Sequence, residues 1–282
     1  MNITIIGVGL IGGSVALGLK GFQTHIIGVD ANPKHVQTAL KLGIIDEAND
    51  LDTAVSKSDL IIMAIPVDAA RKLLPYILNH MPANCTLTDM GSTKSGICQV
   101  AAEHPRRGAY VAAHPMAGTE NSGPEAAIHG LFTHKKTVIC ERELSHSDSL
   151  DVVLKMYEIL QMNILYMSPE DHDRHIAYVS HISHISSFTL GLTVLEIEKD
   201  EERIFDMAST GFASTVRLAK SSPDMWAPIF KQNAPQLSTA LDAYIKNLQL
   251  FKELIEEGNI DEIRKLMTQA NDIRRILDGI RQ

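Results

Sequence analysis

In the first half of the chain, short apolar runs alternate with segments whose apolar residues recur at helical spacing. The run Leu60–Ile65, which ends at Pro66, is typical of a parallel strand buried on both faces. Asn32 and Pro33 are typical of a helix start, and Gly43 of a helix end. The alternation predicts an α/β fold with an N-terminal Rossmann-type, mostly parallel sheet. The predicted strands are Thr4–Ile6, His25–Val29, Leu60–Ile65, Cys85–Asp89, Ala109–Ala113 and Lys136–Cys140.

The second half of the chain changes to a helical pattern. Ser168–Pro169, followed by two acidic residues, is typical of a helix start. Apolar residues at helical spacing predict long helices over residues 237–256 and 260–280, and Gly258–Asn259 separates the two.

This change of pattern predicts two domains, residues 1–165 and residues 166–282. The first is the predicted Rossmann domain and the second is all-helical. Apolar stripes on the helices need a partner to cover them, so we expect a homodimer formed through the helical domain.

Composition narrows the class of protein. The net charge of −8, with scattered basic residues, argues against a nucleic-acid surface. Three widely separated cysteines suggest reduced thiols in a cytoplasmic protein rather than a disulfide framework. No apolar run approaches the roughly 20 residues of a membrane span, so we expect no membrane association. The N-terminus begins at once with strand residues, so we also expect no signal peptide.

A glycine motif after the first predicted strand indicates dinucleotide binding. Gly7 permits a tight turn, Gly9 lets the backbone approach a pyrophosphate, and Gly12 lets helix and strand pack closely. The first helical amides then face the phosphate charge. Asp30, after the second strand, would accept hydrogen bonds from ribose hydroxyls and repel a 2′-phosphate, which favours NAD over NADP. The other predicted cofactor contacts are Leu10, Ile11, Ile65 and Pro66, although core packing would equally explain the last two.

Polar segments that could carry chemistry follow several of the predicted strands. Asp89–Lys94 and His114–Glu120 come directly after strands, as does Pro66. Because ligands bind at the carboxyl ends of parallel strands, we expect these segments to converge on one crevice. Two further segments, His172–His184 and Gly211–Trp226, combine histidine, arginine and tryptophan in the helical half.

With these motifs in place, the chain resembles the prephenate dehydrogenase family of tyrosine biosynthesis. The resemblance covers Asn2 to about Leu250, and the histidine-containing motifs are more specific than the glycine loop. It implies NAD-dependent oxidative decarboxylation of prephenate to 4-hydroxyphenylpyruvate in a homodimer. The matching segments are Gly7–Ser14, Asp89–Lys94, His114–Glu120, His172–His184 and Arg217–Trp226.

The resemblance assigns the catalytic position to His114. Hydride leaves the ring carbon that bears the hydroxyl, so an acceptor must meet that hydroxyl as its oxygen becomes carbonyl-like. An imidazole, with a pKa near ~6.5, can be neutral at cytoplasmic pH and fits this requirement. Ser92 matches the family serine that hydrogen-bonds both the histidine and the substrate hydroxyl, and would orient the ring.

The family's substrate-binding residues are matched in both halves of the chain. Arg217 matches an arginine that pairs with a prephenate carboxylate. His184 matches a site histidine, and Thr119 and Glu120 match residues at the substrate entrance. Many relatives carry an acid three residues before the arginine, where this chain has Ser214, so a gate built on that acid is in doubt.

Other functions remain open at this point. Arogenate dehydrogenase has the same fold and chemistry, and the motifs do not separate the two substrates. A hydroxyacid dehydrogenase or imine reductase would share the glycine loop but is expected to lack both histidine motifs. A non-catalytic NAD-binding protein is a further alternative. His181 and His184 lie on one helical face, but no third ligand has a recognisable spacing, so we expect no metal site.

Overall fold

The computed structural model describes residues 1–199 and 204–280. The chain divides into two compact units, Met1–Ala234 and Pro235–Gln282. The predicted helical domain includes residues 200–203 and 281–282, which lie outside the described residues. In the described part of the chain, no helix is both long and apolar enough to cross a membrane.

The first unit is built on an eight-stranded sheet with the order β3-β2-β1-β4-β5-β6-β7-β8. Neighbouring strands are parallel except β6 and β7, which pair antiparallel. The predicted α/β class with a mostly parallel, Rossmann-type sheet is confirmed. The strands are β1 (Asn2–Ile6), β2 (His25–Val29), β3 (Glu47–Ala48), β4 (Leu60–Met63), β5 (Thr86–Asp89), β6 (Tyr110–Pro115), β7 (Lys136–Cys140) and β8 (Asn163–Met167).

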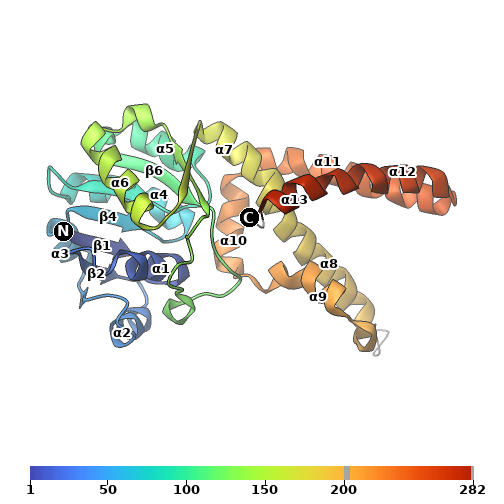
Figure 1. Cartoon of the computed structure of the whole chain (residues 1–282), viewed down its shortest axis with the longest axis horizontal. Coiled ribbons are helices and arrows are strands. Elements are labelled where there is room, and N and C mark those ends of the chain that lie inside the picture. The colour runs from blue at the N-terminus through green and yellow to red at the C-terminus, as the bar shows by residue number, and fades with distance from the viewer. Residues whose placement is uncertain (200–203, 281–282) are drawn as a thin grey trace. The chain divides into compact units, whose positions relative to one another are not determined.

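Helices cover both faces of this sheet (Figure 1). One face packs against α1 (Leu10–Leu19), α2 (Pro33–Lys41) and α6 (Ser147–Ile159). The other packs against α3 (Leu51–Ser56), α4 (Val67–His80) and α5 (Ser95–Ala102). The central strands β1, β4, β5 and β6 are almost wholly buried, which explains the continuous apolar run of β4.

Helices α7 to α10 complete the first unit. A π-helical turn, Ala177–His181, separates α7 from α8 within one helical path. Ser168 caps α7 by accepting a hydrogen bond from the Asp171 amide, as the predicted helix start requires. The helices are α7 (Pro169–Ile176), α8 (Ile182–Glu198), α9 (Thr210–Val216) and α10 (Pro223–Gln232). Two 3₁₀ turns, Ile204–Met207 and Arg217–Lys220, lie between α8 and α10.

Shorter 3₁₀ turns connect the later strands. They are Arg107–Ala109, Pro124–Ala126 and Arg142–Leu144.

All three cysteines are buried free thiols. Burial, the largest cause, raises the pKa of the Cys85 and Cys140 thiols to about 12, so both stay protonated at neutral pH.

The second compact unit contains the rest of α11 (Ala234–Glu256) followed by α12 (Ile260–Ala270) and α13 (Arg274–Ile280). Gly258 adopts a φ of +68° between α11 and α12, and the Asn259 side chain accepts from the Glu262 amide to cap α12. The single helix predicted over 260–280 is wrong in one respect. A 3₁₀ turn at Asn271–Ile273 interrupts it, because asparagine and aspartate favour local turns over continued helix.

Two different divisions of the chain are therefore visible. The change from alternating strands and helices to helices alone falls between β8 and α7, close to the predicted boundary at residue 165. The compact units instead divide after Ala234, because α7 to α10 belong with the sheet.

Candidate active site

The loop between β1 and α1 contains two glycines that admit no side chain. Gly7 has a φ of +94°, and a Cβ there would lie 2.4 Å from the Ala64 carbonyl oxygen. A Cβ on Gly12 would lie 1.9 Å from the Gly7 carbonyl oxygen. By contrast, the heavy atom nearest to a Cβ on Gly9 would be the Gly123 nitrogen, at 4.0 Å. The backbone at Gly9 is therefore not closely covered, as the approach of a pyrophosphate requires.

Asp30 is held beside this loop at the end of β2. Its carboxylate accepts hydrogen bonds from the Val8 amide at 3.0 Å and the Asn32 amide at 2.8 Å. Gly9 begins α1 without a side-chain cap, so the amides of the first turn remain available to an anion. Of the predicted contacts in that turn, Leu10 is buried and Ile11 is partly buried. These features fit a dinucleotide whose adenosine ribose has no 2′-phosphate.

The segment that follows His114 runs alongside the glycine loop. A Cβ on Gly118 would lie 3.9 Å from Ile11 Cδ1, and the Ile128 amide donates to Ser14 Oγ at 2.9 Å. The end of β4 borders the same loop, since a Cβ on Gly7 would approach Ile65 Cγ2 within 2.7 Å. Pro66, next in sequence, is exposed. The structure thus brings the predicted cofactor loop and the predicted catalytic loop together.

His114 lies near the end of β6, opposite Val138 of β7, and is buried. Its Nδ1 is hydrogen-bonded to His172 Nε2 at 2.8 Å, and the two rings meet edge to face. His172 Nδ1 is in turn bonded to Asp173 Oδ1 at 2.8 Å. His172 and Asp173 both belong to α7 and are buried. A chain of three side chains therefore begins at the predicted catalytic residue.

Asp173 also fixes the start of α5. Its Oδ1 accepts from the Lys94 amide at 2.8 Å and its Oδ2 from the Ser95 amide at 2.9 Å. Burial opposes ionisation, but the hydrogen bonds from His172, Ser95 and Lys94 outweigh it and lower the pKa of the Asp173 carboxyl. Asp173 is therefore a carboxylate at neutral pH.

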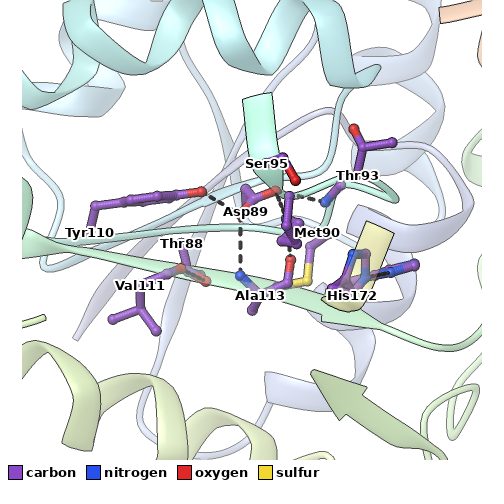
Figure 2. Close-up of polar contacts among 12 residues, drawn as sticks. Thr88, Asp89, Met90, Thr93, Ser95, Tyr110, Val111, Ala113 and His172 are labelled. Atoms are coloured by element: carbon purple, nitrogen blue, oxygen red, sulfur yellow. Dashed lines mark hydrogen bonds and ion pairs between the residues drawn. The ribbon is translucent and has the colours of Figure 1, made fainter. Parts of the chain in front are cut away.

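A second buried network lies beside β6, the strand that contains His114. The Lys94 ammonium pairs with Asp89 and donates to the Ala113 carbonyl at 2.7 Å. Figure 2 shows the Tyr110 hydroxyl and the Ala113 amide directed at Asp89, and their hydrogen bonds measure 2.7 and 3.3 Å. The pair places a fixed positive charge next to the end of β6, one residue before His114.

These surroundings keep His114 neutral. Burial, the largest cause, lowers its pKa well below the ordinary value, and His172, Lys94 and His181 lower it further. A neutral imidazole has one nitrogen that accepts a proton, which suits a hydrogen-bond acceptor for a substrate hydroxyl.

The helical part of the first unit contributes an aromatic cluster. The His184 ring stacks on Trp226 of α10, with centroids 3.5 Å apart. His184 Nδ1 is hydrogen-bonded to the Ser180 carbonyl at 3.0 Å, so Nδ1 is not available to a substrate. Burial lowers the pKa of His184, and the charge of Arg217 lowers it further. His184 and Arg217 are therefore within electrostatic reach of each other.

Arg217 forms an ion pair with Glu120. The Arg217 Nη1 atom lies 2.7 Å from Glu120 Oε2, which joins the start of a 3₁₀ turn to the loop after β6. Arg217 is half exposed, so its guanidinium remains open to solvent. Ser214, at the position of the missing acid, is exposed. The predicted substrate-binding residues Arg217 and Glu120 thus come together without that acid.

The remaining predicted residues are placed as follows. Ser92 is partly buried. Among the described residues, His114 Nδ1 is hydrogen-bonded to His172 rather than to Ser92. Thr119 Oγ1 accepts from the Asn121 amide at 3.2 Å. His181 is fully buried and accepts from Asn233 Nδ2 at 3.2 Å. Within residues 1–199 and 204–280, no cluster of histidine, cysteine, aspartate and glutamate is arranged to hold a metal.

Sequence reasoning assigned no role to His172, Asp173, Asp89 or Lys94. All four lie inside motifs that carry the family resemblance, so their positions were visible. Their connection was not, because His172 reaches His114 across 58 residues of sequence.

Two family models match almost the whole chain. The model described as "Prephenate dehydrogenase, nucleotide-binding domain" matches residues 14–166. The model described as "Prephenate dehydrogenase, dimerization domain" matches residues 168–269.

Individual relatives agree with the family models. Prephenate dehydrogenase of Bacillus subtilis (strain 168) is 29% identical over 286 residues, which is 99% of this chain and 76% of the relative. The crystal structure of prephenate dehydrogenase from A. aeolicus, in complex with hydroxyphenyl propionate and NAD⁺, has a TM-score of 0.90 at 32% identity and is matched over 98% of both chains.

Synechocystis arogenate dehydrogenase is also similar, with a TM-score of 0.75 at 25% identity, over 97% of this chain and 99% of that structure. The family matches confirm the predicted resemblance, enzyme class and nicotinamide cofactor. The chain belongs to the prephenate dehydrogenase family and is an NAD-dependent oxidoreductase.

Proposed function

We propose that this chain oxidises and decarboxylates prephenate to 4-hydroxyphenylpyruvate and CO₂, with NAD⁺ reduced to NADH. The observation that carries the proposal is the buried, neutral His114 at the end of β6, next to the glycine loop. The relatives from B. subtilis and A. aeolicus are named as prephenate dehydrogenases, which supports the same substrate.

The glycine loop would hold the cofactor. Gly7 and Gly12 shape the turn, Gly9 leaves room for the pyrophosphate, and the first-turn amides of Leu10 and Ile11 face it. Asp30 would accept from the ribose hydroxyls and disfavour a 2′-phosphate. Ile65 and Pro66 would lie against the bound cofactor from the end of β4. NAD⁺, when bound, supplies the acceptor for the substrate's hydride.

His114 would act as the hydrogen-bond acceptor and base for the ring hydroxyl. It takes the hydroxyl proton as the ring carbon loses hydride, and returns a proton to the same oxygen when CO₂ leaves and the ring becomes aromatic. Ser92, partly buried in the turn after β5, would orient the hydroxyl. The number of protons on this oxygen is the same before and after the reaction, because the product is a phenol that keeps one proton on oxygen.

Arg217 would bind a substrate carboxylate. In the structure its guanidinium already holds the carboxylate of Glu120, which shows that the group can pair with an anion at this place. Substrate must therefore share or displace Glu120, while Thr119 and His184 would line the entrance. Ser214 can add a hydrogen bond to this network but no charge.

We further propose a cytoplasmic homodimer formed through the helical domain, with functional domains at residues 1–165 and 166–282. The match to a dimerization domain over residues 168–269 supports the dimer. Apolar side chains exposed on α8, among them Leu192 and Leu195, support the same assembly.

The direct test is NADH formation by the purified chain with NAD⁺ and prephenate, beside parallel reactions with arogenate and with NADP⁺. We expect rapid NADH formation with prephenate and NAD⁺. The likeness to an arogenate dehydrogenase makes arogenate the second candidate substrate, and faster turnover of arogenate would replace prephenate as the substrate. Binding of NAD⁺ without turnover of either would contradict the proposal and favour a non-catalytic NAD-binding protein.

A further inference from the structure

The chain His114–His172–Asp173 has only one consistent arrangement of protons. Asp173 is a carboxylate and can only accept, so His172 Nδ1 carries the hydrogen of the 2.8 Å bond between them. A neutral His172 then has a bare Nε2. Because that atom is 2.8 Å from His114 Nδ1, the hydrogen of this second bond must sit on His114. His114 Nε2 is thus left with a free lone pair.

We propose that His172 and Asp173 are positioning residues that fix His114 in this tautomer and hold the proton that His114 takes from the substrate. The inference rests on the proposed function, in which His114 is the base. It gives a function to His172 and Asp173, two buried polar residues of α7. In the described part of the chain, neither side chain is hydrogen-bonded to the glycine loop.

The proton transfer balances over the chain. When the substrate O–H breaks, its proton bonds to His114 Nε2. The Nδ1 proton of His114 then crosses to His172 Nε2, which leaves His114 neutral and makes His172 an imidazolium paired with Asp173. When CO₂ leaves, the electron pair of the breaking C–C bond passes through the ring to its oxygen. The protons return in reverse order, and the phenol O–H forms.

The charges around the chain favour this location of the proton. Burial opposes a lasting imidazolium at His114 most strongly, and the Lys94 ammonium and His181 oppose it further. Burial, the largest cause, and the charge of Lys94 lower the pKa of His172, but its hydrogen bond to Asp173 and the charges of Asp173 and Asp89 act in the opposite direction. Moving the proton one residue along the chain therefore moves positive charge away from a cation and next to an anion.

His172 is the right residue to change, because Asp173 has a second task. Asp173 caps α5 through the Lys94 and Ser95 amides, so its replacement would also disturb that helix. The His172 side chain is hydrogen-bonded to His114 and Asp173. His172→Phe keeps a ring in the cavity and removes both bonds. His175→Phe, at an exposed histidine of the same helix, is the matched control.

The first readout needs neither substrate nor cofactor. Nitrogen-15 spectra of histidine-labelled, full-length protein report which ring nitrogen carries hydrogen, and the His114 signals are identified by their loss in His114→Asn. We expect the Nδ1–H form of His114 in the native chain and in His175→Phe, and a shift toward the Nε2–H form in His172→Phe. A native His114 in the Nε2–H form, or no shift in His172→Phe, would overturn the inference.

The second readout is turnover. We expect His172→Phe to lower kcat at least about 100-fold, the scale of general acid–base catalysis, with KM for prephenate and for NAD⁺ within about 3-fold of native. His172→Gln can accept from His114 Nδ1 but cannot hold a proton. It should restore the native tautomer while kcat stays low, and it replaces His172→Phe if that variant fails to fold. Native kcat in both variants would refute a proton-holding role.

The nitrogen-15 spectra and the turnover measurements together separate this inference from the proposed function. If the native chain oxidises neither prephenate nor arogenate, the proposed function fails, yet the spectra of the ligand-free protein still decide whether His172 fixes the tautomer. If the native chain is active and the spectra show no dependence on His172, the function stands and the inference falls.

Discussion

At the scale of single residues, His114 is expected to determine turnover but not cofactor binding. His114→Asn keeps a polar side chain at the end of β6 and removes the base. Because general base catalysis contributes about 10²- to 10⁴-fold, we expect kcat to fall by that order, with the Kd of NAD⁺ measured by calorimetry near the native value. Retention of most of the turnover would remove His114 from the catalytic role.

Arg217 offers a test of substrate binding at the same scale. Charge-assisted hydrogen bonds contribute about 1.5–3 kcal/mol, so we expect Arg217→Ala to raise KM for prephenate roughly 10- to 100-fold and to lower kcat much less. Arg174→Ala is the matched control, since Arg174 forms an exposed ion pair with Asp171 on α7. Steady-state kinetics of both variants decide the matter, and an unchanged KM in Arg217→Ala would exclude the proposed contact.

His181 predicts how stability depends on pH. Burial, the largest cause, lowers its pKa from 6.5 to about 4 in the folded chain. As the pH falls below 6.5 the unfolded chain binds a proton that the folded chain excludes, so stability is lost between pH 6.5 and 4. The loss for one group is at most about 1.4 kcal/mol per pH unit.

Urea unfolding across that pH range measures this effect. His181→Phe keeps a ring beside Trp226 and Phe230 and should make the pH dependence shallower by up to one proton. The same change at the exposed His175 is the control. Equal slopes for the native chain and His181→Phe would show that His181 does not titrate as its burial requires.

Residue types and spacing predicted the glycine loop and Asp30 from the sequence because both depend on local geometry. The absence of close backbone contacts at Gly9 within the described residues and the amides bonded to Asp30 agree with that expectation. The partner of His114 was a different problem. Ser92 was expected there, whereas His172 holds Nδ1, because contact across 58 residues of sequence depends on how α7 packs against β6. The catalytic role of Ser92 stays a prediction.

At the scale of elements, the junction of β1 and α1 separates two functions of glycine. A methyl group on Gly12 would collide with the Gly7 carbonyl, whereas one on Gly9 would make only an ordinary van der Waals contact with the Gly123 nitrogen. We expect Gly12→Ala to destabilise the fold by about 1–3 kcal/mol or more, as overpacking does, with a lower Tm. Gly9→Ala should leave Tm near native but weaken NAD⁺ binding.

Thermal unfolding and NAD⁺ titration of these two variants give the comparison. Full NAD⁺ affinity in Gly9→Ala would mean that the pyrophosphate does not approach this backbone. An unchanged Tm in Gly12→Ala would mean that α1 can move away from the turn, contrary to the contact of a Gly12 Cβ with backbone.

Some strands and helices could be predicted from the sequence more completely than others. The continuous apolar run Leu60–Ile65 predicted β4 because both faces of that strand are buried. The strand Lys136–Cys140 was also predicted, but not its antiparallel pairing with β6, since strand direction follows from the path of the connecting chain. The π-helical turn Ala177–His181 left no periodic signal, although it lies between His172 and His184.

At the scale of the whole molecule, the hydrogen-bonded side chains His114, His172 and Asp173 connect the two predicted domains. His114 belongs to residues 1–165, while His172 and Asp173 belong to residues 166–282. Asp173 also binds the amides at the start of α5, so the side chain that is hydrogen-bonded to His172 also connects α7 to the helix layer over the sheet. This explains why the compact unit extends to Ala234 although the strands end at Met167.

Assembly provides the last prediction. Leu192 and Leu195 lie three residues apart on α8 and are 63% and 50% exposed in the single chain, within the region that matches a dimerization domain. We expect the native chain to have the mass of a dimer in light scattering. Leu192→Glu combined with Leu195→Glu would place unpaired charges on that face and should give monomers, because burying an unpaired charge is costly.

The control is Leu144→Glu, which changes a leucine of similar exposure at 46% in the turn after β7 and should leave the dimer intact. If the native chain is monomeric at working concentration, or if the α8 variant stays dimeric while Leu144→Glu dissociates, the predicted interface is wrong. Loss of the dimer in the α8 variant alone would place the subunit contact on α8, the helix that also carries His184, and would connect assembly to the substrate entrance.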